Sequence, residues 1–332
     1  MRGHAPPPIR QRGVALLTAI LLVALGTILA ATMAYETAMT AQRAQATFAF
    51  DQSLLIAEAG EALAAYALVQ SRKQDQQHDA KGQLWSMPYG PVEIVPGVTL
   101  LASLEDMQGR FNLNNLVKPD GGTDPAAVTQ FENLLQLAQV EPKWASMIAD
   151  WIDGDSVANG PDGAEDSTYL SQVPPYRAAN RQITSASELL ALPGFGRDRY
   201  LRIIRYVTAL PTGSQTGGGQ TSGKTLVNLC TAQRYVLDAL VPTGERNFSA
   251  QDDESLEKQR MSGGCFPTPN DFKAAFASDP NAAAVMGQVS TQSDYFRLTS
   301  VVSVGTMQFS LYSLLKRENG KIHVIQRTFT AD

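Results

Sequence analysis

Histidine is nearly absent from this sequence of 332 residues, and only His4, His78 and His323 carry an imidazole. A Ser-His-Asp catalytic set is therefore not credible, because such a set needs a well-placed histidine as its general base. No Walker A sequence and no dinucleotide-binding glycine pattern follows a predicted strand. The sequence indicates no enzyme.

Positive charge is in the minority. Lysine and arginine number 27 against 32 aspartates and glutamates, which gives a formal net charge of −5 and an isoelectric point near 5.3. Such an acidic chain offers no general surface for nucleic acid, so that polyanion binding would need a local basic patch. The hydrophobic content of 44% is ordinary for a globular protein. The length leaves room for about two domains beyond an N-terminal segment.

A long stretch near the N-terminus lacks both charge and proline. It runs from Val14 to Ala34, and at about 1.5 Å rise per residue a helix of this length spans a bilayer core about 30 Å thick. A removable signal peptide is the alternative, but its apolar core usually has about 7–15 residues before a break. Here no proline occurs between Pro8 and Pro88. The segment therefore predicts a membrane-spanning helix.

Charged residues on the two sides of this span predict its orientation. Arg2, Arg10 and Arg12 precede it, whereas Glu36 follows it and the next positive charge is Arg43. The positive-inside rule then places the N-terminus in the cytoplasm. The bulk of the protein is expected on the other side of the membrane.

The helix is expected to continue beyond the membrane to about Ser71. Leu55, Ala59, Ala62 and Tyr66 recur there at helical spacing, in a segment dominated by alanine and leucine. One long N-terminal helix, first apolar and then amphipathic, is predicted.

Cysteine is the other scarce residue. Only Cys230 and Cys265 are present, and their wide separation fits no usual zinc-ligand spacing. In an oxidising compartment outside the cytoplasm two cysteines most often pair. We therefore predict one disulfide, with a contribution on the order of 3–4 kcal/mol to stability. Two unrelated buried thiols are the alternative.

The order of features at the N-terminus resembles that of type IV prepilins and pseudopilins: a basic leader ending in Gly13, a hydrophobic helix and an amphipathic continuation. The resemblance implies that a prepilin peptidase cuts after Gly13 and that the mature chain begins with an N-methylated Val14. Ordinary members carry a glutamate at the fifth mature position, where this chain has Thr18. That glutamate is thought to pair with the terminal amine of a neighbouring subunit, since a carboxylate in lipid is tolerated only with a partner. A subunit without it need not dock beneath another one.

The missing glutamate, the long chain and two segments, SLEDMQGRFNLNNL from Ser103 to Leu116 and PPYRAAN from Pro174 to Asn180, occur together here. In combination they are similar to those of one family, the type II secretion minor pseudopilins called general secretion pathway protein K. The resemblance implies a single-pass inner-membrane protein with a periplasmic globular part, incorporated into the periplasmic pseudopilus. Its partners would be two other minor pseudopilins in a tip complex, the major pseudopilin, the prepilin peptidase and the inner-membrane assembly platform. Its function would be to prime assembly and to support export of folded proteins across the outer membrane.

Strand-forming patterns flank a helical block in the remainder of the chain. Residues 92–106 and the segment from Tyr295 onward alternate and are rich in β-branched residues, and Asn319-Gly320 predicts a type I′ hairpin turn. Between them, Asp124-Pro125 predicts a capped helix start. The stretch from Thr212 to Thr225 consists mainly of glycine, serine and threonine and is expected to form a flexible loop.

These patterns predict an α+β fold, in which the long N-terminal helix packs on an antiparallel sheet and a large α-helical domain is inserted between the strands. The arrangement resembles the type IV pilin-like fold of protein K. The expected divisions are a leader at residues 1–13, the transmembrane helix at 14–34, the first part of the pilin-like domain at 35–116, the inserted helical domain at 117–285 and the C-terminal strands at 286–332.

The densest acidic segment lies at residues 150–166, where six carboxylates stand among glycines. Oxygen ligands on a turn-rich backbone suit calcium, which takes about 6–8 oxygens at about 2.3–2.6 Å. The segment is no EF-hand, because counting from Asp153 places Val157 and Ala158 where an oxygen ligand and the invariant glycine belong. A solvated acidic loop with Asx turns is the alternative.

Two further segments resemble signatures of the protein K family. They are SLEDMQGRFNLNNL, from Ser103 to Leu116, and PPYRAAN, from Pro174 to Asn180. The resemblance implies calcium in the helical domain, and the candidate ligands are Asp153, Asp155, Asp162, Glu165 and Asp166. Arg110 and Arg177 are suited to tie loops onto carbonyl or carboxylate oxygens, so both signatures are expected to be structural.

Two other functions need consideration. The segment from Leu192 to Val207 resembles a helix-hairpin-helix motif, whose backbone amides receive a nucleic-acid phosphate, and it carries several arginines. A membrane-anchored periplasmic DNA-binding protein is therefore the alternative function, although one copy of the motif in an acidic chain favours a solvated helical hairpin. Paired carboxylates also occur in glycosidases, but few aromatic residues accompany them here, and catalysis is not expected.

Overall fold

The computed structural model describes residues 12–212, 223–241, 247–277, 279–280 and 282–330. Most of the predicted leader and most of the predicted glycine-rich loop lie outside these residues. The chain forms two compact units, Met1–Leu55 and Ile56–Asp332. Helix α1 (Arg12–Gln74) supplies the described part of the first unit and enters the second. It ends three residues after the predicted Ser71, and the predicted long helix is confirmed.

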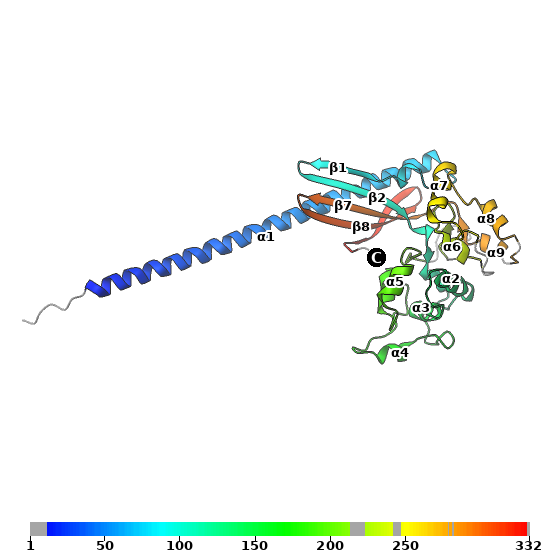
Figure 1. Cartoon of the computed structure of the whole chain (residues 1–332), viewed down its shortest axis with the longest axis horizontal. Helices are drawn as coiled ribbons and strands as arrows, with labels where there is room; N and C mark the ends of the chain where they lie inside the picture. Colours follow the sequence, from blue (N-terminus) through cyan, green and yellow to red (C-terminus); the bar gives the residue numbers. More distant parts are fainter. Residues whose placement is uncertain (1–11, 213–222, 242–246, 278, 281, 331–332) are drawn as a thin grey trace, which may run out of the picture. The chain divides into compact units, whose positions relative to one another are not determined.

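A five-stranded antiparallel sheet organises the second unit (Figure 1). Its strand order is β1-β2-β7-β8-β9, so that β2 and β7 are neighbours although the whole helical block separates them in sequence. The turn between the last two strands contains Asn319 and Gly320, with φ of 51° and 74°, as a type I′ turn requires. The strands are β1 (Tyr89–Val95), β2 (Val98–Asp106), β7 (Tyr295–Val304), β8 (Met307–Glu318) and β9 (Lys321–Thr328).

The C-terminal part of α1 packs on one face of this sheet. Ala64 and Leu68 lie against Phe296 and Leu315, and the ring of Trp85 meets that of Phe296 at 5.2 Å. The predicted α+β fold, with a long helix on an antiparallel sheet, is confirmed.

The approach of α1 to the sheet is close at Gly60. A Cβ at this position would lie 2.7 Å from the Oγ of Ser300 on β7. The same hydroxyl donates to the carbonyl of Ala57 at 3.2 Å. The next residue, Glu61, accepts a hydrogen bond from Ser313 and forms two hydrogen bonds with Arg327. These contacts fix the position of the helix along the strands.

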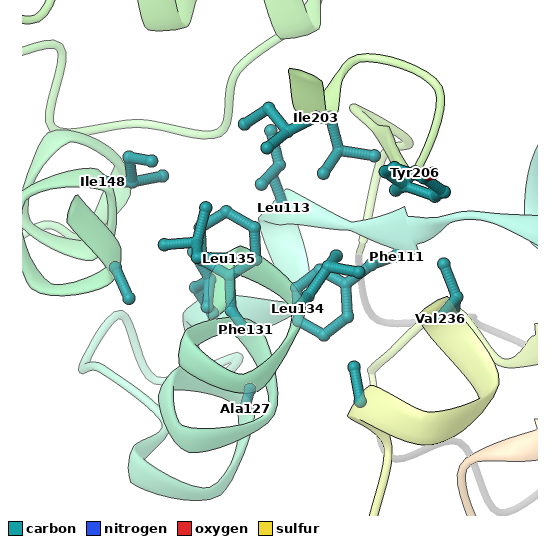
Figure 2. Packing of buried hydrophobic residues seen from close by; sticks show 14 of the residues in the cluster. Phe111, Leu113, Ala127, Phe131, Leu134, Leu135, Ile148, Ile203, Tyr206 and Val236 are labelled. Carbon is teal, nitrogen blue, oxygen red and sulfur yellow. The ribbon is translucent and has the colours of Figure 1, made fainter. Parts of the chain in front are cut away.

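The helical region, residues 107–294 between β2 and β7, encloses the largest apolar cluster. Figure 2 shows Phe131 and Leu134 of α2 beside Phe111, with Ile148 of α3 and Val236 of α6 on either side. The helices are α2 (Pro125–Leu137), α3 (Trp144–Ile152), α4 (Asp166–Leu170), α5 (Gly196–Ile203), α6 (Arg234–Ala239), α7 (Asp253–Gly263), α8 (Pro269–Ala275) and α9 (Ala282–Met286). Short 3₁₀ turns are η1 (Leu84–Ser86), η2 (Met107–Gly109), η3 (Leu113–Leu116) and η4 (Ala186–Ala191).

The helical core extends beyond the expected limits of 117–285 at both ends. Phe111 and Leu113 belong to it, and β3 (Phe111–Asn112) pairs in parallel with β4 (Val207–Thr208) rather than with the large sheet. At the other end, β6 (Val289–Ser290) pairs with β5 (Val227–Asn228). Phe111, Val207 and Val227 of these short strands are buried in the helical core and Val289 is half-buried against it, which local alternation alone does not reveal.

Three asparagines explain the segment from Ser103 to Leu116. Asn112 receives the amide of Leu210 and donates to its carbonyl, and Asn114 exchanges the same pair of bonds with Ile183. Asn115 does so with Thr225. Each side chain thus replaces a β-ladder partner for a distant backbone segment. The expected structural role of this motif is confirmed.

The junction between the sheet and the helical region is polar and buried. Asp106, the last residue of β2, accepts hydrogen bonds from Asn228, Thr231, Ser293 and the amide of Gln108. Because burial penalises its charged form, the pKa of Asp106 is raised to about 6.

The predicted disulfide lies next to this junction. Cys230 and Cys265 are bonded, with Cα atoms 4.3 Å apart. Arg260 on α7 lies nearby in the chain and donates to the carbonyls of Leu229, Ala232 and Phe266. The disulfide prediction is confirmed.

Candidate functional site

The first unit presents an apolar surface. Large apolar side chains from Val14 to Met33 are 52–68% exposed. Among the described residues, α1 is the one helix that is long and apolar enough to cross a membrane. Apolar surface of this extent requires lipid or a protein partner to cover it.

The hydroxyl groups within this stretch are satisfied inside the helix. Thr18 donates to the carbonyl of Ala15 at 3.0 Å, and Thr27 and Thr32 donate to the carbonyl three residues earlier. A threonine bonded in this way adds no charge and leaves no unmade donor in lipid. The position where the prepilin resemblance expects glutamate is therefore uncharged, and its hydroxyl donor is already hydrogen-bonded within the helix.

In the second unit α1 carries apolar residues on the face that is turned away from the sheet. Tyr66 is 62% exposed and Leu63 is 41% exposed, whereas Ala64 and Leu68 are buried on the sheet side. Ala59 and Ala62 are exposed as well. We call Ala59, Ala62, Leu63 and Tyr66 the exposed stripe. The helical spacing read from the sequence thus identified mainly the uncovered face.

Three acidic side chains converge in the helical region, and we call them the carboxylate cluster. One oxygen each of Asp153, Asp155 and Glu165 lies within 4.8 Å of the others. Asp153 follows the last residue of α3, and Glu165 precedes the first residue of α4. The cluster is therefore held by two helix ends, with Asp155 on the loop between them.

The charges in this cluster repel one another, and no ion pair with a basic side chain balances them among the described residues. Burial, followed by the charges of Asp150, Asp153 and Asp155, raises the pKa of Glu165 to about 7. Burial and the same kind of repulsion also raise the pKa of Asp153. Oδ1 of Asp153 and both carboxylate oxygens of Glu165 are buried with no hydrogen-bond partner among the described residues. Since unpaired buried carboxylates are costly, the arrangement suits a cation that prefers oxygen.

The other two expected ligands do not join the cluster. Asp166 pairs with Arg177 at 2.8 Å and accepts the amide of Ala178 at 3.1 Å. Asp162 is exposed on the loop. The structure therefore brings together three of the five expected ligands. It also places beside them Asp150, one of the six carboxylates of the acidic segment but not an expected ligand, and Asn159, for which the sequence predicted no role.

The comparisons with known proteins agree with this architecture. A family model described as protein K of the type II secretion system matches residues 109–212, which include the carboxylate cluster. Type II secretion system protein K of Pseudomonas aeruginosa is 30% identical over 328 residues, which cover 96% of this chain and 92% of that protein. The chain belongs to the type II secretion system protein K family.

Further similarities extend over the same length. Protein K of Aeromonas hydrophila is 29% identical, over 96% of this chain and 97% of its own. A chain in the crystal structure of the GspK-GspI-GspJ complex of enterotoxigenic Escherichia coli aligns with a TM-score of 0.73, at 24% identity over 87% of this chain and 100% of that chain. The expected assignment as a minor pseudopilin of type II secretion is confirmed, and nothing supports the alternative of a DNA-binding protein.

Two arginines of the hairpin-like motif, Arg199 and Arg202, have structural partners in this protein K member. Arg199 on α5 contacts both carboxylate oxygens of Glu141, at 2.6 and 2.7 Å, and also the carbonyl of Gly194. Arg202 donates to the carbonyl of Gln139. These bonds tie α5 to the segment before α3, which accounts for part of the basic character without a nucleic acid.

Proposed function

We propose that this protein K member occupies the tip of the pseudopilus, in complex with two other minor pseudopilins, and primes fibre assembly for the export of folded proteins across the outer membrane. The observation that carries the proposal is the apolar surface of α1, which is uncovered from Val14 to Met33 and occurs again as the exposed stripe in the second unit. Two partner helices would cover this surface outside the membrane. The presence of a similar chain in a complex of three proteins supports the class of partner.

The tip position follows from two features. Thr18 offers no carboxylate to a neighbouring amine, so this subunit does not need another subunit above it. The helical region interrupts the pilin-like part between β2 and β7 and adds bulk on one side of it. A subunit that needs no neighbour above and carries a large insertion is suited to begin a fibre.

Membrane insertion and processing complete the proposal. The N-terminus lies in the cytoplasm and the second unit in the periplasm, because the arginines of the leader precede the span. Prepilin peptidase removes the leader after Gly13 and Val14 becomes the methylated N-terminus. The major pseudopilin and the inner-membrane assembly platform then act on the mature chain. The role is mechanical and no catalytic step is assigned to it.

We also propose that the carboxylate cluster binds calcium. Asp153, Asp155 and Glu165 supply hard oxygen ligands, and three of their oxygens are buried without another partner among the described residues. Bound calcium would neutralise the repulsion among these groups and join the ends of α3 and α4. Asp166 is left out of the proposed ligand set because Arg177 already pairs with it, and Asp162 because its carboxylate is not among those that converge.

The exposed stripe provides the test of the assembly proposal. The full chain carrying Tyr66→Glu is expressed with two candidate minor pseudopilins and purified in detergent. We expect co-purification to fall at least tenfold, because a charge in a packed helix interface is left without a partner. The thermal midpoint of the isolated variant should stay unchanged, since Tyr66 is largely exposed.

Tyr89→Glu is the matched control. Tyr89 is also about half exposed, but it lies on strand β1 rather than on α1. This variant should bind both partners as the wild type does. If Tyr66→Glu also retains full binding, the exposed stripe is not the assembly surface.

A further inference from the structure

Asp150 differs from the carboxylate cluster in having both oxygens engaged. It lies in the last turn of α3 and is completely buried. Its Oδ2 accepts the amide of Ala164 at 2.6 Å, and the amide of Asn159 lies 3.1 Å from Oδ1 and 3.2 Å from Oδ2. The side-chain nitrogen of Asn159 donates to Oδ1 as well. Asp150 is thus occupied by N–H donors from the loop that joins α3 to α4.

Asp153 is held differently. Its Oδ2 accepts from the hydroxyl of Thr123 at 2.8 Å and lies 3.2 Å from the side-chain nitrogen of Asn159, whereas its Oδ1 is buried without a partner among the described residues. Both oxygens of Glu165 are unpartnered in the same way. Among the described residues, Glu165 therefore has two carboxylate oxygens without a hydrogen bond, Asp153 has one and Asp150 has none.

We propose that Asp150 is a positioning residue for the cation site and is not a ligand, whereas Asp153 binds through Oδ1 alone and Glu165 binds through both oxygens. This inference rests on the proposed calcium site and assigns its internal organisation. The hydrogen bonds of Asp150 with the amides of Asn159 and Ala164 hold the loop against α3, and Glu165 directly follows Ala164 in the chain. The same contacts therefore bring Glu165 to Asp153.

Gly163 completes this arrangement. A Cβ at this position would lie 2.5 Å from Oδ2 of Asp150 and 2.5 Å from the amide nitrogen of Asn159. No side chain larger than hydrogen fits without moving the loop away from Asp150. Asp150 also adds a negative charge next to the cation without taking a coordination position, which leaves room for water on the ion.

Europium luminescence can separate a ligand from a positioning residue. Eu³⁺ takes the place of calcium in the detergent-solubilised full chain, and its lifetimes in H₂O and D₂O report the number of coordinated waters. For Asp150→Asn we expect the affinity to fall about 10–100-fold, as is usual for groups that orient a ligand. The water number should stay equal to that of the wild type. Asp155→Asn removes a proposed ligand and should raise the water number by about one.

Two further variants guard the interpretation. Gly163→Ala keeps every carboxylate but displaces Asp150, and it should lower the affinity in the same way without adding a water. It also serves if Asp150→Asn does not fold. Asp162→Asn removes the same charge from an exposed position of the same loop, and its affinity should stay within twofold of the wild type.

The outcomes distinguish this inference from the site itself. An extra coordinated water in Asp150→Asn would make Asp150 a ligand, and unchanged affinity in both Asp150→Asn and Gly163→Ala would remove its positioning role. Either result overturns the inference and leaves the calcium site in place. If the wild-type chain binds neither calcium nor europium, the proposed site fails, and the inference fails with it.

Discussion

The buried carboxylate at the junction of the sheet and the helical region makes the stability of the second unit depend on pH in an unusual direction. Burial raises the pKa of Asp106 from 3.8 to about 6. The native state therefore binds a proton more tightly than the unfolded state does. The contribution of this group to stability is complete below pH 3.8 and is lost as the pH rises through about 6.

The magnitude follows from the two pKa values. A difference of about two pH units corresponds to about 3 kcal/mol in the free energy of unfolding, of which about 2–3 kcal/mol is recovered between about pH 7.5 and pH 4. Asp106→Asn removes this titration. The stability of the wild type relative to that variant should thus increase by about 2–3 kcal/mol over the same acid range. Any constant offset from the altered hydrogen bonds cancels in this comparison.

Tryptophan fluorescence during urea unfolding of the detergent-solubilised full chain is a suitable assay. All three tryptophans, Trp85, Trp144 and Trp151, belong to the second unit. Asp120→Asn, which makes the same substitution at an exposed position, is the control. A constant difference for Asp106→Asn, or one that shrinks towards acid, would refute the reasoning.

Two other predictions concern the N-terminus and the cation. Gly13→Phe should block leader removal, so that mass spectrometry finds the uncut chain and secretion stops, whereas Gly3→Phe should be processed normally; a correctly cut Gly13→Phe chain would contradict the prepilin assignment. Chelation should lower the melting temperature of the wild-type full chain, because calcium at 100 times its Kd stabilises the native state by about 2.7 kcal/mol. Glu165→Gln should not respond to the chelator, and an unresponsive wild type would argue against a bound ion.

The parts of the fold that could be predicted from the sequence carry strong local signals. An uncharged run defined α1, alternation defined the strands of the large sheet, and Asn319-Gly320 defined their last turn. Helix α7 (Asp253–Gly263) was not predicted, because it is mostly polar and its two large apolar residues, Leu256 and Met261, form no apolar period. The small parallel pair of β3 and β4 joins residues far apart in the chain, and no local pattern reports such a pairing.

The candidate site shows the same division between local and distant information. The sequence located an acidic, glycine-rich loop, and in the structure the carboxylates of Asp153, Asp155 and Glu165 lie close together there. Which of them face the centre depends on the path of the backbone. Asp166 forms an ion pair with Arg177 instead of joining the cluster. Asp150, three residues before Asp153, accepts hydrogen bonds from amides of the loop. Asp150 belongs to the same acidic segment of the sequence, but no local pattern shows that loop amides occupy its carboxylate.

The pairing of β2 with β7 has a consequence for how such a chain can change. Asp106 and Phe296 are opposite one another in this ladder, so the backbone departs for the helical region and returns at adjacent points. An insertion whose two ends lie at the same end of a strand pair can be lengthened, exchanged or excised while the two strands keep their register. Excision would, however, strip Asp106 of Asn228 and Thr231, leaving a buried acid with fewer donors. A minimal version of this scaffold would therefore need an apolar or amide residue at that single junction.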